Sequence, residues 1–272
     1  MVTGMQSKAN GGTMQVNRAK GVDSARRVLQ ILLSFSESNP VITVEGISTE
    51  FGISVPSAYR YISLLRELYL IEESGRGSYA LTPQVFRLAS VAESSIDIGK
   101  IAMPVVNRLV DETHETVLVM RRIRDSAVCV ASTRPDKQAT ISFRPGHLMP
   151  LHRGAGSKVL LSATSVDKQQ KYLQRLEETL GPERVEALRK ELALIGKQRY
   201  AISSAEVDEG IYAVAAPIVV EGRTIAALSI AGLEFRLSED RRAELLDKVR
   251  EGAVEISGML FSREYGDSEI AG

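Results

Sequence analysis

The chain has 272 residues, of which 44% are hydrophobic and 25% charged, and it is long enough for two globular domains. Lys+Arg and Asp+Glu are equal at 34 each, so no overall field draws the chain to nucleic acid or to an anionic membrane. Any contact with DNA must therefore come from a local positive patch.

The cysteine content and the N-terminus narrow the possible class of protein further. Cys129 is the only cysteine, which excludes an intrachain disulfide and disfavours a thiolate zinc site. No apolar run approaches the roughly 18 residues that indicate a membrane helix, and the first 20 residues lack the apolar core of a signal peptide. We expect residues 1–20 to form a flexible tail and the protein to be cytoplasmic, without a membrane partner.

Three helices are predicted in the segment that follows the tail. The first has an apolar stripe at helical spacing from Ala25 to Phe35 and ends before Pro40. The second is short and has Thr43 as its N-cap, and Gly52 makes the turn that follows it. The third begins with Ser54 as its cap.

The third helix has two different faces. Ala58, Ile62 and Leu65 fall on one side of a 3.6-residue wheel, whereas Arg60 and Ser63 point away from it. Two short apolar runs around a Ser-Gly-Arg-Gly turn come next, which predicts a β-hairpin. Helix, helix, turn, helix and hairpin is the order of a winged helix-turn-helix, which we place at residues 21–82.

The remaining residues predict an α+β domain. Residues 83–96 are helical and form a linker, and strand-like runs begin at Thr116, Ala127 and Ala139. Residues 166–197 favour helix, and two further strands form a hairpin that turns at Glu221-Gly222 before a last helix. Strands flanked by helices indicate an antiparallel sheet at residues 97–264.

Four segments in this order resemble the IclR family of bacterial transcriptional regulators. They are GVDSARRVLQIL, the stretch from ISTEFGISVPSAYRYISLLREL to TPQVFRL, MPLHRGAGSKVLL, and VDEGIYAVAAPIVVEGRTIAALSIAG. The resemblance implies a GAF-like effector-binding domain at residues 97–264 and a homodimer or dimer of dimers. The chain departs from the family pattern at Val55 and Pro56, where lysine and serine are usual, and at Ser24, where arginine is frequent.

A helix-turn-helix of this kind places its third helix in the major groove of double-stranded DNA. Arg60 has the reach for a guanine edge or a phosphate, and a symmetric dimer implies a near-palindromic operator. On an ordinary small domain the same side chains would be solvated surface residues. The DNA-contacting candidates are Ser54, Ser57, Tyr59, Arg60, Ser63, Arg76, Arg26 and Arg27.

The segment PLHRGAGSK predicts a loop that enters a helix at Gly154 and Ala155. Bare N–H groups at a helix start hold anions, but glycines serve equally well for close helix packing. The resemblance favours the first interpretation and implies a small organic-acid effector. The effector-binding candidates are Leu148, Gly154, Ala155, Glu206, Asp208, Ala215, Ser229 and Ala231.

Other functions are also conceivable for this sequence. A hydrolase would use Ser157, His152 and Glu206, but Ser157 lacks the spacing of a nucleophile elbow. His147 and His152 have the types of side chain that bind metals, although such histidines more often line pockets. A winged helix that mediates only protein contacts is a third alternative. We predict a regulator rather than an enzyme, without a cofactor or metal, and leave the sign of its control open.

Overall fold

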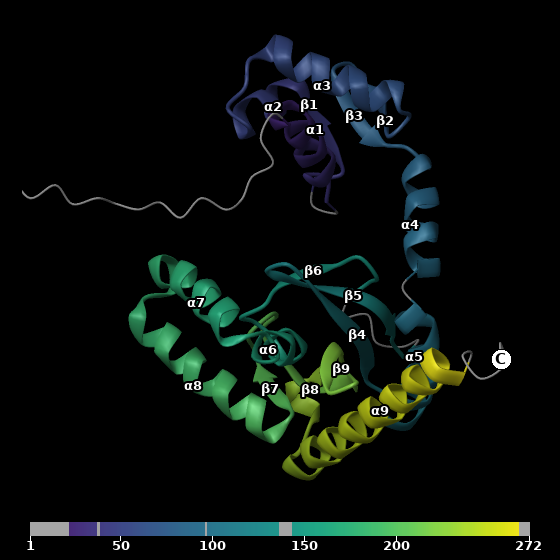
Figure 1. Cartoon of the computed structure of the whole chain (residues 1–272), viewed down its shortest axis with the longest axis vertical. Coiled ribbons are helices and arrows are strands. Elements are labelled where there is room, and N and C mark those ends of the chain that lie inside the picture. The colour runs from purple at the N-terminus through teal and green to yellow at the C-terminus, as the bar shows by residue number, and fades with distance from the viewer. Residues whose placement is uncertain (1–21, 37–38, 96, 136–142, 267–272) are drawn as a thin grey trace, which may run out of the picture. The chain divides into compact units, whose positions relative to one another are not determined.

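The computed structural model describes residues 22–36, 39–95, 97–135 and 143–266, so the predicted tail lies outside the described residues. The chain divides into two compact units between Ala92 and Glu93 (Figure 1). Each unit has its own hydrophobic core. None of the helices in the described ranges is both long and apolar enough to cross a membrane.

The N-terminal unit is a winged helix-turn-helix, as predicted. Its three strands form an antiparallel sheet in the order β1-β3-β2. The elements are α1 (Asp23–Leu33), β1 (Val41–Thr43), α2 (Val44–Glu50), α3 (Val55–Glu67), β2 (Ile71–Gly75) and β3 (Ser78–Leu81). The strand β1 was not predicted, because three residues are too few to show an alternating pattern.

Local signals explain where these helices begin and turn. The hydroxyl of Thr43 accepts a hydrogen bond from the Gly46 N–H at 3.0 Å and so caps α2. Gly52 has a φ of 58°, a conformation that glycine adopts without strain, between α2 and α3. Ala58, Ile62 and Leu65 are buried against the other helices, which leaves the opposite face of α3 to solvent.

The C-terminal unit contains a six-stranded antiparallel sheet in the order β6-β5-β4-β9-β8-β7. Helix α4 (Gln84–Ser95) leads from the first unit into it. The strands are β4 (Thr116–Ile123), β5 (Ser126–Thr133), β6 (Leu148–Pro150), β7 (Ala201–Ser204), β8 (Ile211–Val220) and β9 (Arg223–Leu233). The other helices are α5 (Asp97–Thr113), α6 (Ala155–Ser162), α7 (Val166–Leu180), α8 (Pro182–Gln198), η1 (Glu234–Arg236) and α9 (Glu239–Gly266).

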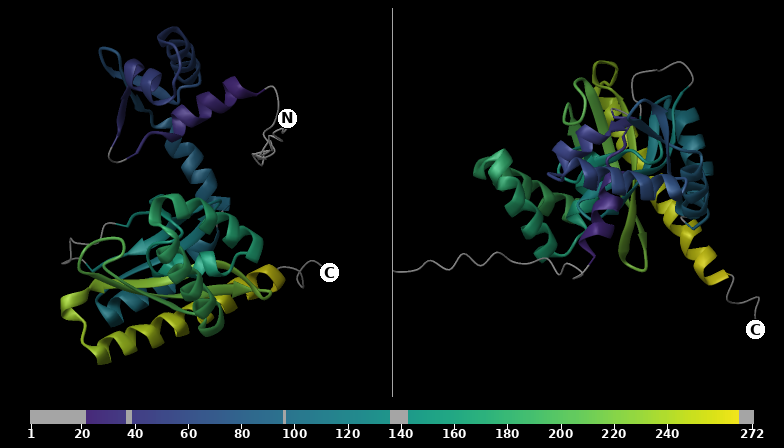
Figure 2. Two further views of the ribbon diagram at one scale, coloured as in Figure 1. Left: turned by 90° about the vertical axis from the view of Figure 1, so that its left-hand side faces the viewer. Right: turned by 90° about the horizontal axis from the view of Figure 1, so that it is seen from above.

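Helices cover both faces of this sheet, and each face has its own apolar cluster. Helices α5 and α9 cover one face, where Val214, Leu228 and Ile230 are fully buried (Figure 2). Helix α6 packs on the other face, with α7 and α8 outside it, over Leu118 and Met120. The alternation of side chains along each strand produces these two surfaces.

The structure confirms most of the predicted strands and corrects the rest. Both central residues of the β8–β9 turn have positive φ, 49° at Glu221 and 72° at Gly222, as a two-residue hairpin requires. The run predicted at 139–145 lies outside the described residues up to 142, and residues 143–145 are not a strand. Strands β6 and β7 were not predicted, since both are short edge strands.

Candidate functional sites

The exposed side of α3 holds a short chain of polar side chains at its N-terminal end. The hydroxyls of Ser54 and Ser57 lie 3.0 Å apart, and Arg60 Nη2 donates to the Ser57 hydroxyl at 3.1 Å. Ser54 stands at the N-cap position, but its side chain does not cap a backbone N–H. This arrangement orients the guanidinium of Arg60 along the solvent face of the helix.

The other residues predicted to contact DNA are on the surface but are not part of this cluster. Tyr59 is 49% exposed on α3, Ser63 is also exposed on that helix, and Arg76 lies in the turn between β2 and β3. On α1, Arg27 is exposed, whereas Arg26 forms an ion pair with Asp23 at 2.9 Å.

In the C-terminal unit, the N-terminus of α6 binds one side chain of β7 and one of the loop that follows it. Gly154 is the N-cap, with a φ of 83°. Its N–H donates to Glu206 Oε2 at 2.9 Å, and the Ala155 N–H donates to Ser203 Oγ at 3.1 Å. A carboxylate at this position satisfies a backbone donor and is favoured by the helix dipole.

The buried Lys158 supplies the positive charge that balances the carboxylate of Glu206. Lys158 is 1% exposed, and its Nζ lies 2.5 Å from Glu206 Oε1 and 2.5 Å from Glu191 Oε1. It also donates to the carbonyl of Ile202 at 3.3 Å, while Arg153 Nε donates to the carbonyl of Glu206 at 2.6 Å. The loop is therefore tied to α6 through both the backbone and the side chain of Glu206.

The sheet surface beneath α6 has small side chains on β8 and β9 beside Leu118 and Met120 of β4. The register aligns Ala215 of β8 with Ser229 of β9, and Ala213 with Ala231. The Ser229 hydroxyl donates to the carbonyl of Val214 at 3.0 Å. A Cβ at Gly156 would lie 2.6 Å from Met120 Sδ and 3.7 Å from Ser229 Cβ, so the helix approaches the sheet closely because residue 156 is glycine.

The structure brings some of the predicted effector residues together and separates others. Gly154, Ala155 and Glu206 meet at the α6 N-terminus, and Ala215, Ser229 and Ala231 lie on the sheet. In contrast, Leu148 is 59% exposed on the edge strand β6. Asp208 is also exposed, and within the described residues its carboxylate has no hydrogen-bond partner.

Sequence reasoning missed Ser203 and Lys158 as members of this site. Ser203 faces α6, whereas the hydroxyl of Ser204 donates to Glu234 at 2.7 Å. The sequence of β7 gave no signal for Ser203, because the apolar Ile202 is exposed while Ala201 and Ser203 are buried. Nothing in the local sequence distinguishes Lys158 from a surface lysine.

The three side chains of the hydrolase alternative do not form a relay. His152 Nδ1 lies 2.9 Å from the Tyr172 hydroxyl, and the Ser157 hydroxyl is buried without a hydrogen-bond partner in the described part of the chain. Burial, followed by the charge of Arg153, lowers the pKa of His152. Among the described residues, the Ser157 hydroxyl is therefore hydrogen-bonded to no base.

His147 and Cys129, the other side chains able to bind a metal or to react, contact neighbouring residues of the fold. The ring of His147 packs edge-on against Phe143 with centroids 5.3 Å apart. Among the residues described, no three metal-binding side chains cluster. Cys129 is 2% exposed, and burial raises the pKa of its thiol to about 11.

The chain is similar to known regulators over most of its length. Residues 91–258 match the family model described as Bacterial transcriptional regulator IclR C-terminal. The HTH-type transcriptional regulator KipR of Bacillus subtilis is 28% identical over 246 residues, which cover 89% of this chain and 97% of KipR. KdgR of Escherichia coli is 28% identical over 250 residues, with 90% and 95% covered.

Solved structures show the same fold. An IclR family regulator from Brucella abortus superposes with a TM-score of 0.77 at 21% identity and covers 88% of this chain and 93% of its own. An IclR homologue from Microbacterium hydrocarbonoxydans, complexed with 4-hydroxybenzoate, has a TM-score of 0.72 at 20% identity, with 87% and 98% covered.

Proposed function

Since the chain belongs to the IclR family of bacterial transcriptional regulators, and so regulates transcription rather than catalysing a reaction, we propose which of its surfaces contact the operator and the effector. The exposed side of α3 enters the major groove, with Arg60 directed at a guanine edge or a phosphate. The link from Ser54 through Ser57 to Arg60 supports this assignment, because it orients the guanidinium before DNA is bound.

The effector is a small organic acid whose carboxylate binds at the N-terminus of α6. The observation that carries this proposal is the hydrogen bond from the Gly154 N–H to the Glu206 carboxylate at 2.9 Å. The Gly154 amide already binds the carboxylate of Glu206, so the carboxylate of an effector binds there in the same way. The binding of 4-hydroxybenzoate by a protein of the same fold supports the choice of chemical class.

Binding at Gly154 requires the effector to replace the side chain of Glu206. Lys158 then pairs with the incoming carboxylate while keeping Glu191, so no buried charge is left without a partner. The displaced loop, from Ala205 to Gly210, begins and ends with residues of positive φ. An effector that favours the displaced state shifts the protein toward it and so changes operator affinity.

The regulator acts as a homo-oligomer on a near-palindromic operator, in the cytoplasm where the chromosome lies. Apolar side chains that are exposed in the single chain support a contact with a second copy. Leu29 and Leu33 on α1 are 58% and 81% exposed, and Phe86 on α4 is 75% exposed. Such residues cluster at surfaces that become buried on association.

An electrophoretic shift on the DNA upstream of the protein's own gene, repeated over a salt series, tests the operator surface. Arg60→Ala is expected to weaken binding by roughly 5- to 150-fold, the effect of one contact to a base edge. Arg184→Ala removes the same charge from an exposed position on α8 and serves as the control. Equal losses in both variants would refute the assignment of Arg60.

A thermal-shift screen against small carboxylic acids, including 4-hydroxybenzoate, tests the effector site with and without operator DNA. Gly154→Val is expected to abolish the ligand-induced shift and to leave operator binding intact, because its Cβ would lie 2.9 Å from Val207 Cγ2. Circular dichroism establishes that the variant is folded. If Arg60→Ala impaired ligand binding as much as Gly154→Val, the proposed division of roles would be wrong.

A further inference from the structure

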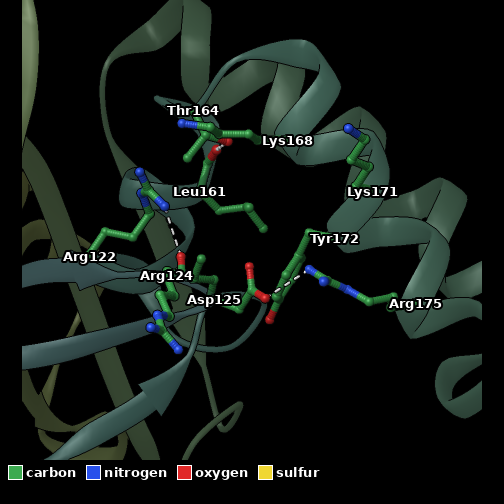
Figure 3. Close-up of a pocket in the computed structure, with 10 residues that line it drawn as sticks. Arg122, Arg124, Asp125, Leu161, Thr164, Lys168, Lys171, Tyr172 and Arg175 are labelled. Atoms are coloured by element: carbon green, nitrogen blue, oxygen red, sulfur yellow. Dashed lines mark hydrogen bonds and ion pairs between the residues drawn. The ribbon is translucent and has the colours of Figure 1, made fainter. Parts of the chain in front are cut away.

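A pocket lies in the C-terminal unit, between the β4–β5 turn and helix α7, and has a volume of about 280 Å³ (Figure 3). Its floor is apolar: Leu151 and Leu161 are each 1% exposed, and Tyr172 is 7% exposed. None of the effector-binding residues discussed above lines it. It is therefore separate from the site at the α6 N-terminus.

The rim of this pocket is strongly basic, although the whole chain has no net charge. Its cationic residues are Arg122, Arg124, Lys168, Lys171 and Arg175. Its one carboxylate, Asp125, forms an ion pair with Arg175 at 2.9 Å. Within the described ranges, the other four cations have no acidic partner within 4.0 Å.

These cations come from two separate segments that face each other. Lys168, Lys171 and Arg175 follow one face of α7, where alone they would form an ordinary solvated stripe. Arg122, near the end of β4, and Arg124, in the β4–β5 turn, line the other side of the opening, where the Arg122 guanidinium donates to the Arg124 carbonyl at 2.8 Å (Figure 3). Like charges placed around one hollow repel each other, and a bound anion removes that repulsion.

We propose that this pocket binds a small phosphate-bearing metabolite. A phosphate group offers several acceptor oxygens to lysine and to the guanidinium forks of Arg122 and Arg124. The apolar floor takes the carbon part of the molecule, and Asp125 accepts a hydrogen bond from one of its hydroxyls. The volume is near the lower limit for ligand pockets, which favours a small metabolite over a larger one.

The floor of the pocket contacts the loop that precedes α6. The Tyr172 hydroxyl lies 2.9 Å from His152 Nδ1, and His152 stands two residues before Gly154. Arg175 Cζ lies 6.0 Å from the centroid of the Tyr172 ring, within reach of a cation–π contact. An anion that draws Arg175 away from Asp125 therefore also changes the surroundings of Tyr172 and His152.

Isothermal titration of the full chain with pyrophosphate and with glycerol 3-phosphate tests binding. The double variant Arg122→Ala/Lys171→Ala is expected to weaken both by about tenfold or more, since two charge-assisted contacts are lost. The matched control is Arg184→Ala/Lys190→Ala, which removes two charges from exposed positions on α8. Binding in the control should equal that of the unchanged protein.

Three results would overturn the proposal. One is that the unchanged protein binds neither probe. Another is that both double variants lose affinity equally, which would mean that only general surface charge matters. A loss of operator affinity in Arg122→Ala/Lys171→Ala, with no probe bound, would assign these cations to the DNA backbone.

A separate NMR measurement tests the contact with the α6 loop and needs no effector. Pyrophosphate is expected to shift the imidazole resonances of His152 in the unchanged protein but not in Tyr172→Phe, which lacks the hydroxyl. Both proteins are compared at probe concentrations that titration shows to be saturating, so that a weaker affinity of the variant does not affect the comparison. Unchanged His152 resonances in the presence of bound probe would show that the pocket is not coupled to the loop that precedes α6.

Discussion

Glu206→Gln is the substitution that most directly perturbs the contact between α6 and the loop after β7. The amide of glutamine keeps the size of the side chain and an oxygen that accepts from the Gly154 N–H. It removes the negative charge and places an NH2 donor opposite Lys158 Nζ, which keeps its second partner, Glu191. The variant therefore weakens the contact without creating a cavity or leaving Lys158 unpaired.

The expected loss is about 1 kcal/mol. A hydrogen bond to a charged acceptor contributes about 1 kcal/mol more than one to a neutral acceptor. The helix N-terminus adds about 0.3–1 kcal/mol for a negative charge. The Glu206 side chain is 31% exposed, so solvent screening reduces both contributions. A loss of this size makes local opening at the α6 N-terminus roughly five- to tenfold more frequent.

Native-state hydrogen exchange at the Gly154 and Ala155 amides measures this opening. Exchange at both amides should accelerate in Glu206→Gln by that factor, with little change on β8 and β9. Asp208→Asn is the control, because it makes the same charge change two residues along the loop at an exposed side chain. The reasoning fails if Asp208→Asn accelerates exchange as much, or if Glu206→Gln leaves exchange unchanged.

Three further substitutions or reactions test the core of the C-terminal unit. Gly156→Val should destabilise the C-terminal unit by about 1–3 kcal/mol, because even its Cβ would lie 2.6 Å from Met120 Sδ. The loss should appear as a lower urea midpoint for unfolding, and an unchanged midpoint would contradict this close approach. Burial raises the pKa of Glu115 above its usual 4.5, so its contribution to stability is present below pH 4.5 and is lost as the pH rises through the higher folded value. Glu115→Gln should therefore raise the melting temperature at pH 7, and the gain should vanish near pH 4; a constant gain would refute burial as the cause. Cys129, with a pKa of about 11, should resist a thiol reagent at pH 8 until the protein is unfolded, and rapid labelling of the native state would show that it is accessible.

Signals that act over a few residues were visible in the sequence. The cap at Thr43, the positive-φ turn at Glu221-Gly222 and the two faces of α3 all depend on near neighbours. The winged helix and the antiparallel sheet follow from such signals, because helix and strand periods are local properties. The placement of Gly154 at the start of a helix was predictable for the same reason.

Tertiary structure alone decided which side chains meet. Glu206 reaches Gly154 across 52 positions of sequence, and Lys158 reaches Glu191 across 33. The choice of Ser203 over Ser204 depends on which face of β7 packs against α6. The basic pocket likewise forms only when α7 lies opposite the β4–β5 turn. Contacts of this kind depend on how strands pair and helices pack, which no local period of the chain encodes.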